Sequence, residues 1–250
     1  MRRVFLSDVH LSHREPERTA RLMRFLEREA PRTAELYILG DLFDYWIGPR
    51  HLDLPDYREA LDALRRAAAG GTAIYFLLGN RDFYMRRRFA AETGLRIVPG
   101  RTEHRLETSG RRVYLCHGDY MEGRRGLGFA IQRAIRSRWV EAAFTRLPVA
   151  AQDGGARFYR WLSGRKTRGP KAGPAHLGPH GLYEPALLAE FARGTDLIVC
   201  GHVHRAGEWR LDAAGPDKVL YTLGDWSDGE GYLEEEDGQW RLCGGAGPNA

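Results

Sequence analysis

The chain has 250 residues, of which 43% are hydrophobic and 28% are charged, and its formal net charge is +5. This composition is ordinary for a soluble globular protein. No apolar stretch approaches the roughly 18 residues of a membrane span, and the first ten residues lack the apolar core of a signal peptide. The three cysteines, Cys116, Cys200 and Cys243, are odd in number and form no CxxC motif, so we expect free thiols and a cytoplasmic location.

Short apolar runs alternate with helical patterns through the first 117 residues. The expected helices cover 16–29, 57–71 and 84–93, and the expected strands cover 4–8, 35–41, 73–78 and 111–119. Later strands are expected at 195–204, 218–226 and 231–242. Alternation of strands and helices predicts a layered α/β fold, which is a sheet architecture covered by helices.

The segment 121–182 differs from the rest of the chain. It contains a long amphipathic pattern over 126–147, a shorter aromatic pattern near 158–162 and a Gly- and Pro-rich stretch over 165–181. Between residues 120 and 185 there are 12 Lys and Arg against 4 Asp and Glu, an excess of +8 that leaves the remainder of the chain at −3. Such a segment is either a packed helical pair with a solvated basic face or a lid for an anionic, partly apolar ligand; beside the motifs described below, we favour the lid.

Polar side chains follow five of the apolar runs. The five segments are Asp8-Val9-His10, Gly40-Asp41-Leu42-Phe43-Asp44, Gly79-Asn80-Arg81-Asp82, Cys116-His117-Gly118-Asp119 and Gly201-His202-Val203-His204. One Asp-x-His pair is most often a turn cap, but five such segments at strand exits are hard to explain in that way. Open α/β sheets place their ligands at the carboxyl ends of strands, so this edge is the expected site.

The candidate metal ligands are oxygen and nitrogen donors without a thiolate. They are Asp8, His10, Asp41, Asn80, His117, His202 and His204. This donor set suits Mn, Fe, Zn or Co better than a structural zinc site. Seven ligands are too many for one ion with open positions, and they suit two ions that share a carboxylate.

The motifs DVH, GDLFD, GNRD, HGD and GHVH, in this order, resemble those of the calcineurin-like metallophosphoesterase superfamily. The resemblance runs nearly end to end and implies an α/β sandwich of two mixed sheets flanked by helices, with a dimetal centre at the loops. It implies that Asp8, His10, Asp41 and His204 hold one metal and that Asp41, Asn80, His117 and His202 hold the other, with Asp41 bridging. Asp44, Asp82 and Asp119 are not ligands in this scheme, and they either orient the site or cap strand ends.

A closer resemblance is carried by LYILGDLFDYWIG, GNRDF, FTRLP, GHVHRA and LGDW, which are similar to motifs of the UDP-2,3-diacylglucosamine diphosphatases of lipid A synthesis. Most of the superfamily has GNH where this chain has GNR. A diphosphate substrate has a phosphate leaving group with a second pKa of about 6, so it departs without an acid, and it needs charge neutralisation instead. Arg81 offers a permanent fork of donors for that purpose, beside the ligand Asn80. The alternative is that Arg81 pairs with Asp82 or another surface acid.

The resemblance implies a complete reaction. Two divalent ions, expected to be Mn²⁺, would activate a water that attacks a phosphorus of UDP-2,3-diacylglucosamine, giving UMP and 2,3-diacylglucosamine 1-phosphate. We therefore treat 1–250 as one metallophosphoesterase domain with a helical lid at 121–182. In that lid Arg157, Arg160, Arg165 and Lys166 are expected to face the substrate. The basic segment would also suit the anionic cytoplasmic face of the inner membrane.

The lid segment departs from the family pattern. Residues 163–185 are rich in Gly and Pro and contain no Asp, and Arg124 and Arg125 stand where the family tends to carry acidic residues. Another nucleotide-diphosphate or phosphodiester hydrolase on the same dimetal site is therefore the alternative function. A non-catalytic scaffold would be expected to have lost ligands. A nucleic-acid partner is not expected, since only the basic segment and the pI of about 9.2 favour it.

Overall fold

The computed structural model describes most of the chain outside the basic segment. The described residues are 1–12, 14–46, 52, 55–82, 85, 87–98, 102–122, 178, 180–244 and isolated positions between 134 and 154. The lid residues Arg157, Arg160, Arg165 and Lys166 lie outside this part of the chain.

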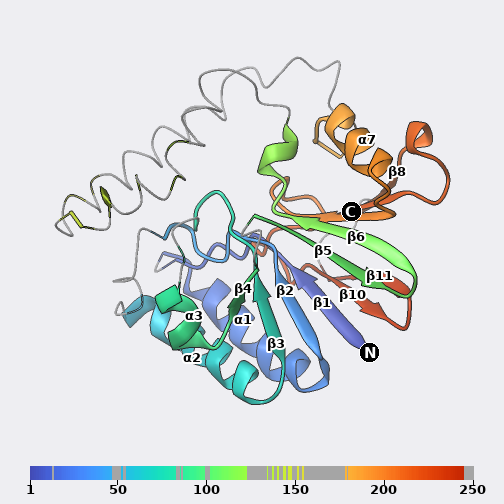
Figure 1. The fold of residues 1–250 in the computed structure, drawn as a ribbon. Helices are drawn as coiled ribbons and strands as arrows, with labels where there is room; N and C mark the ends of the chain where they lie inside the picture. Colours follow the sequence, from blue (N-terminus) through green and yellow to red (C-terminus); the bar gives the residue numbers. More distant parts are fainter. Residues whose placement is uncertain are drawn as a thin grey trace.

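Two mixed sheets form the centre of the fold (Figure 1). The first has the order β11-β10-β1-β2-β3-β4, in which β1 to β4 run parallel and β10 pairs antiparallel with β1. Its strands are β1 (Arg2–Leu6), β2 (Glu35–Ile38), β3 (Ala73–Phe76), β4 (Arg96–Ile97), β10 (Tyr232–Glu236) and β11 (Gln239–Cys243).

The second sheet has the order β5-β6-β7-β9-β8, with β6, β7 and β9 parallel and β5 and β8 antiparallel at the edges. Its strands are β5 (Glu103–Thr108), β6 (Arg111–Cys116), β7 (Leu197–Cys200), β8 (Gly207–Arg210) and β9 (Val219–Thr222).

Helices cover the outer face of each sheet, so the molecule has four layers. Helices α1, α2 and α3 pack on the first sheet and α7 on the second (Figure 1). Their bounds are α1 (Pro16–Glu29), α2 (Pro55–Ala69), α3 (Arg87–Thr93) and α7 (Glu184–Ala192), with short 3-10 turns η1 (Ala30–Arg32), η3 (Asp119–Glu122) and η5 (Asp212–Ala214). The predicted arrangement of two mixed sheets flanked by helices is confirmed.

The alternation of side chains along β1 shows how the layers are held together. Val4 and Leu6 point into the core beneath α1 and α2, whereas Phe5 points into the core between the sheets. All three side chains are fully buried. Because successive strand residues face opposite sides, a strand buried on both faces needs an unbroken apolar run.

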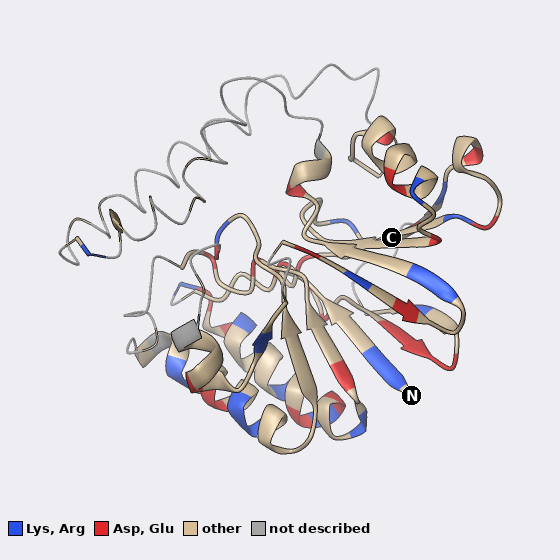
Figure 2. Cartoon of the chain, in the orientation of Figure 1, with Lys and Arg blue, Asp and Glu red and all other residues tan. Residues whose placement is uncertain are grey.

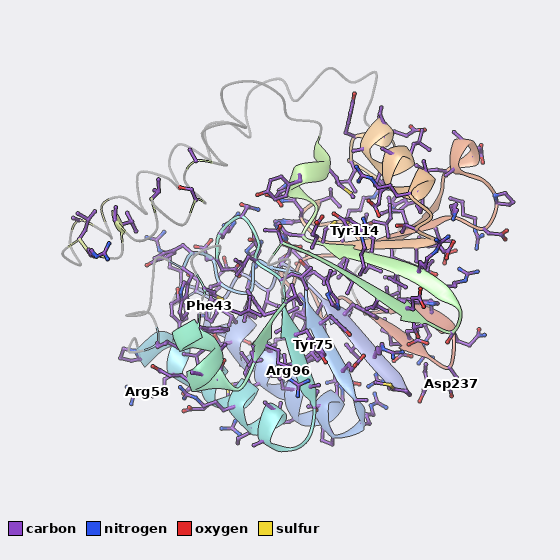
Figure 3. All side chains as sticks on the ribbon, viewed as in Figure 1. Phe43, Arg58, Tyr75, Arg96, Tyr114 and Asp237 are labelled. Atoms are coloured by element: carbon purple, nitrogen blue, oxygen red, sulfur yellow. The ribbon has the colours of Figure 1, made fainter. Side chains whose placement is uncertain are left out.

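The core between the sheets is rich in aromatic rings. Within the first sheet Tyr37 stacks on Tyr75 with ring centroids 4.9 Å apart, and across the two sheets Tyr37 stacks on His104 and Trp240 stacks on Tyr221. Figure 3 labels Tyr75, which lies on the first sheet. This packing fixes the two sheets against each other, and with them the positions of their strand ends.

The opposite end of the sheets is held by ion pairs. Arg2 and Arg3 begin β1 beside acidic residues of the neighbouring segments, which Figure 2 shows as blue next to red at the N-terminus. The charged side chains of Arg2 and Arg3 are thus paired with acids at this end. The candidate metal ligands lie at the other end, after the carboxyl ends of the strands. In the described part of the chain, no helix is both long enough and apolar enough to cross a membrane.

Candidate metal centre

The two sheets bring their carboxyl ends to one edge, where all seven candidate ligands meet. Asp8 and His10 follow β1, Asp41 follows β2 and Asn80 follows β3 in the first sheet. His117 follows β6, and His202 and His204 follow β7 in the second. The site is therefore built between the sheets, and neither sheet alone contains it.

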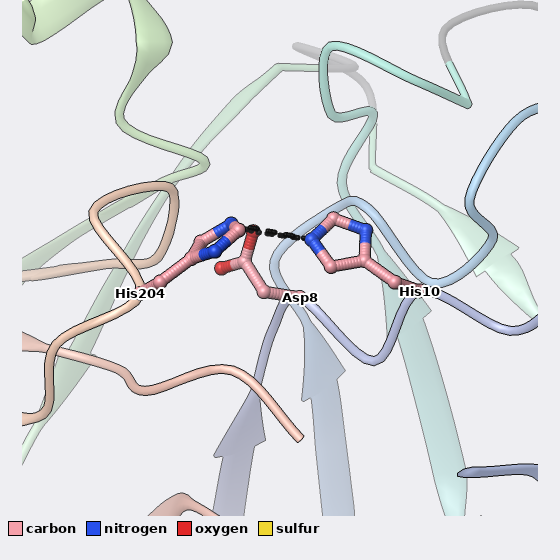
Figure 4. A group of neighbouring side chains, drawn as sticks. All are labelled: Asp8, His10 and His204. Atoms are coloured by element: carbon pink, nitrogen blue, oxygen red, sulfur yellow. Dashed lines mark hydrogen bonds and ion pairs between the residues drawn. The ribbon is translucent and has the colours of Figure 1, made fainter. Parts of the chain in front are cut away.

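Asp8, His10 and His204 form one cluster of donor atoms (Figure 4). The Nε2 atoms of His10 and His204 lie 3.2 Å apart, and Oδ1 of Asp8 lies 3.7 Å from the first and 3.4 Å from the second. Asp8 and His10 are buried, while the His204 side chain is 39% exposed. The cluster thus has an enclosed base and a mouth that opens to solvent.

Asp41, Asn80, His117 and His202 form the neighbouring cluster. The amide nitrogen of Asn80 lies 3.1 Å from Oδ2 of Asp41, 2.9 Å from Nε2 of His117 and 3.2 Å from Nδ1 of His202. Oδ2 of Asp41 lies 3.6 Å from Nε2 of His117. Asp8 is also within reach of Asp41 and His117, so the two clusters adjoin.

One hydrogen bond fixes the orientation of His117. Its Nδ1 donates to the backbone carbonyl of Leu39 over 2.9 Å, which leaves Nε2 facing the cluster with its lone pair. In a metal-binding imidazole, the hydrogen bond from the ring nitrogen that does not face the metal usually sets the tautomer.

Backbone strain is concentrated at the site. Seven described residues other than glycine have positive φ, and five of them are candidate ligands: Asp8 at 55°, His10 at 53°, Asp41 at 52°, His202 at 72° and His204 at 56°. The other two, Ser109 and Asp237, lie in tight turns between antiparallel strands. A left-handed residue costs free energy, and such residues persist where function selects the conformation.

Two glycines are required because backbone approaches the carboxylates closely. A Cβ on Gly79 would lie 2.2 Å from Oδ1 of Asp41, and a Cβ on Gly201 would lie 2.3 Å from Oδ2 of Asp8. No side chain fits in either position without moving a candidate ligand.

The two carboxylates make the site electronegative. Burial of His117 works against protonation, but the carboxylates of Asp41 and Asp8 raise its pKa to about 9. By contrast, burial lowers the pKa of His10 to about 4, so that imidazole is neutral at physiological pH. The surroundings therefore favour a positive charge at His117, where a bound metal ion would take the place of the proton, and they leave His10 as a neutral nitrogen donor.

The donor set fits divalent metal ions. Among the described residues, Oδ1 of Asp8 and Nδ1 of His10 are buried side-chain atoms without a hydrogen-bond partner. A buried carboxylate oxygen with no donor is costly, and a cation would remove that cost. Three imidazoles and two carboxylates from the site fall into the two groups that could hold an ion.

Arg81 lies beside the second cluster and forms an ion pair, as in the alternative to a substrate contact, but with Asp44 and not with Asp82. Its Nη1 contacts Oδ1 of Asp44 at 2.5 Å, and its Nε lies 3.5 Å from Oδ2 of Asp41. Its backbone N–H donates to Oδ1 of Asp41 over 2.9 Å. The Arg81 side chain is 38% exposed, so it stands at the rim of the site.

Asp82 and Asp119 are placed differently from each other. Asp82 is fully buried, and its two carboxylate oxygens accept the backbone N–H groups of Leu42 and Gly79, each over 2.8 Å. It therefore ties the loop that carries Asp41 to the loop that carries Asn80. Burial and the charge of Asp41 raise the pKa of Asp82 to about 7. Asp119 begins η3.

Sequence reasoning missed Asp225. Its Oδ2 lies 3.8 Å from Nδ1 of His204, on the side of the ring away from His10. Asp225 follows β9, another parallel strand of the second sheet. The signal that found the other sites, an apolar run that ends in Gly and a polar residue, is present in LYTLGDW (220–226) as well.

The layered fold and the cluster of Asp, His and Asn side chains define a metal-dependent phosphoesterase. The chain belongs to the calcineurin-like phosphoesterase family, whose model matches residues 1–206. Membership in this family, together with the donor set, supports divalent metals at the site.

The curated relatives point to one branch of the family. The chain is 33% identical over 243 residues to the UDP-2,3-diacylglucosamine hydrolase of Aeromonas salmonicida (strain A449), covering 97% of this chain and 92% of that protein. It is 34% identical over 245 residues to the UDP-2,3-diacylglucosamine hydrolase of Stenotrophomonas maltophilia (strain K279a), covering 97% and 98%.

A solved structure supports the fold independently. The dimetal phosphatase from Danio rerio aligns with a TM-score of 0.52 at 14% identity, covering 94% of this chain and 91% of that one. At this identity the likeness concerns the arrangement of sheets and helices.

Proposed function

We propose that this protein hydrolyses the diphosphate bond of UDP-2,3-diacylglucosamine, giving UMP and 2,3-diacylglucosamine 1-phosphate. The observation that carries the proposal is the meeting of seven nitrogen and oxygen donors at one edge, with the Arg81 guanidinium at the rim. The names of the curated relatives supply the substrate.

The seven residues are proposed to hold two divalent ions. Asp8, His10, Asp41 and His204 would hold one, and Asp41, Asn80, His117 and His202 the other, with Asp41 shared. The contacts of Asp41 with Asn80 and His117 support its place in the second set, and the contact of Asp8 with His10 and His204 supports the first. Asn80 would have to present its amide oxygen rather than the nitrogen that now faces these groups.

Two bound ions would supply an activated water and charge neutralisation for the phosphoryl oxygens. Asn80 and Arg81 then act directly on the substrate. The Asn80 amide belongs to the second cluster, where the amide atom that does not face the metal would orient a phosphoryl group. The Arg81 guanidinium offers parallel N–H donors to the oxygens of two adjacent phosphates, and it keeps its charge at any physiological pH. Since the departing group is itself a phosphate, no protonated side chain is needed at that position.

The identity of the metal is a separate proposal. Hard carboxylate and amide oxygens with imidazole nitrogens accept Mn²⁺ well, so we propose a Mn²⁺ pair. Zn²⁺ binds most such sites more tightly, which makes reconstitution of chelated protein with each metal the informative comparison.

The alternative function is a phosphodiesterase or another nucleotide-diphosphate hydrolase on the same site. The observation that favours this alternative is the composition of the lid segment, which departs from the family pattern. A panel of UDP-2,3-diacylglucosamine, UDP-N-acetylglucosamine and bis-p-nitrophenyl phosphate separates these functions. We expect the acylated substrate to be cleaved fastest; preference for the p-nitrophenyl ester would establish the alternative.

The lid remains part of the proposal. Residues 121–182 would cover the metal edge, and Arg157, Arg160, Arg165 and Lys166 would face the diphosphate and sugar. Aromatic residues of the same segment, such as Trp161, would contact the acyl chains. The basic face of the segment would rest on the anionic inner leaflet while the protein stays cytoplasmic.

Trp161→Asp should then damage hydrolysis of the acylated substrate and spare a soluble UDP-sugar. Equal loss on both would make Trp161 a core residue.

A further inference from the structure

The ion-pair partner of Arg81 is Asp44, which is not among the proposed metal ligands. The guanidinium has two anionic neighbours, Asp44 at 2.5 Å and Asp41 at 3.5 Å. Asp41 is proposed as the bridging metal ligand, so its charge is directed to the ions. Asp44 is then the carboxylate that remains to hold the guanidinium in place.

Asp44 stands on a rigid support. Its backbone N–H donates to the carbonyl of Leu11 over 3.0 Å, and Phe43 forms an isolated bridge with the same residue. Phe43 and Trp46 on either side are buried, with ring centroids 4.8 Å apart, and Phe43 packs close to α2 and α3 (Figure 3). Burial of two large rings next to a short polar residue leaves its side chain little freedom to move.

The same segment is bonded to Arg81 through the backbone. The N–H of Trp46 donates to the carbonyl of Arg81 over 2.9 Å. The two segments are therefore joined twice, by this backbone hydrogen bond and by the side-chain contact between Asp44 and Arg81. A contact held at both ends costs less side-chain entropy than a surface ion pair between two mobile chains.

The pair leaves part of the guanidinium open to solvent. Asp44 is 14% exposed and Arg81 is 38% exposed, so the acid lies beneath and the guanidinium lies above it. A guanidinium has five N–H donors, and Asp44 engages it at Nη1. The N–H donors that face neither Asp44 nor Asp41 can meet an anion while Asp44 keeps the plane of the group fixed.

We propose that Asp44 is a positioning residue, which holds the Arg81 guanidinium over the metal edge in the orientation that receives a diphosphate. This inference rests on the proposed function, because it assigns Arg81 to the substrate. It predicts that Asp44 acts through Arg81 and has no effect on the metals of its own.

A double-mutant cycle tests this assignment. Asp44→Ala should lower kcat/KM for UDP-2,3-diacylglucosamine about tenfold in the wild-type background and less than about twofold in an Arg81→Ala background. Asp44→Asn, which keeps the shape and an acceptor oxygen, should give a smaller loss with the same dependence on Arg81. Equal losses in both backgrounds, or no loss in the wild type, would overturn the assignment.

Two further measurements keep the result specific. Asp62→Ala, which removes the acid of another Arg–Asp contact on helix α2, should leave kcat/KM and metal content unchanged. The cycle is also read on the affinity of Mn²⁺-loaded protein for UMP by calorimetry. Wild-type protein that binds UMP with the expected coupling but fails to cleave the acylated substrate would overturn the proposed function and retain the role of Asp44. Cleavage of the acylated substrate without coupling between Asp44 and Arg81 would overturn the role of Asp44 and retain the proposed function.

Discussion

Single residues at the metal edge can be tested one at a time, and Arg81 is the most informative of them. Arg81→Ala should slow diphosphate hydrolysis about 10- to 100-fold, since a charge-assisted hydrogen bond contributes roughly 1.5 to 3 kcal/mol. Metal content, measured by mass spectrometry, should be unchanged. Arg58→Ala is the matched control, because Arg58 is exposed on α2 (Figure 3). An unaltered rate in Arg81→Ala would show that the guanidinium serves only its ion pair.

Gly79 tests whether the close approach of backbone to carboxylate shapes the metal site. A Cβ at this position would lie 2.2 Å from Oδ1 of Asp41, so Gly79→Ala must displace a candidate ligand. We expect metal stoichiometry below that of the wild type and a loss of activity of at least tenfold, the order seen when outer contacts of a metal site are disturbed. Gly231→Ala, where the nearest atoms lie 3.8 Å away, should bind metal normally. Full metal content in Gly79→Ala would refute the steric argument.

The sequence predicts that the seven candidate ligands lie at one edge, where the structure brings them together, but it does not predict their supporting contacts. Each candidate ligand follows an apolar run, which is a local pattern. Asp82 and Asp44 act on residues some forty positions away, and these pairings appear only when the loops meet. From the sequence, Asp82 either orients the site or caps a strand end. In the structure its carboxylate accepts hydrogen bonds from the backbone N–H groups of Leu42 and Gly79.

At the level of elements, helix α1 and strands β1 and β10 are joined by a buried ion-pair network. Arg2, 7% exposed, contacts Glu29 and Glu234 at 2.8 Å each. Removal of Glu29 leaves buried Arg2 with one carboxylate instead of two, so Glu29→Gln should lower the free energy of unfolding by roughly 1.5 to 3 kcal/mol, the range for a hydrogen bond to a charged group. Urea unfolding at pH 7 measures this, with the exposed Glu27→Gln as control. A difference below the error of the method would mean that solvent replaces the lost carboxylate.

The same network predicts a dependence on pH. Burial opposes ionisation of Glu29, but Arg32, Arg28 and Arg2 hold its pKa below the usual 4.5. A carboxylate whose pKa is lower in the folded state stabilises the fold above the unfolded pKa and loses that effect as pH falls through the folded pKa. The gap in stability between wild type and Glu29→Gln should therefore narrow below about pH 4.5. A gap that stays constant down to pH 3 would contradict the lowered pKa.

The sequence predicts elements with strong patterns and misses weak ones. Residues 16–29 were expected as a helix and form α1. Strand β5 (Glu103–Thr108) was missed because it is an edge strand that alternates exposed and partly buried positions in a polar sequence. Helix α7 was missed because its apolar residues are not confined to one stripe, which removes the helical signal. Both elements gain their stability from the second sheet.

For the whole molecule, metal binding and folding should be linked. A chelator should abolish activity, and Mn²⁺ should restore it best. Since an ion that binds only the folded state stabilises it by roughly 2.7 kcal/mol at a hundred times its Kd, the chelated protein should also unfold at a lower temperature. Asp41→Ala is the matched control, and its unfolding temperature should respond much less to the chelator. Equal responses would place the stabilising metal elsewhere.

The most direct test of the account follows the oxygen atom that enters the product. Mn²⁺-loaded protein is incubated with UDP-2,3-diacylglucosamine in water enriched in the heavy oxygen isotope, and both products are weighed by mass spectrometry. Attack of water on the phosphorus next to uridine predicts UMP with one heavy oxygen and unlabelled 2,3-diacylglucosamine 1-phosphate. Label in the sugar phosphate would contradict the assigned point of attack. Intact substrate, with UMP released from another UDP-linked compound instead, would contradict the proposed function.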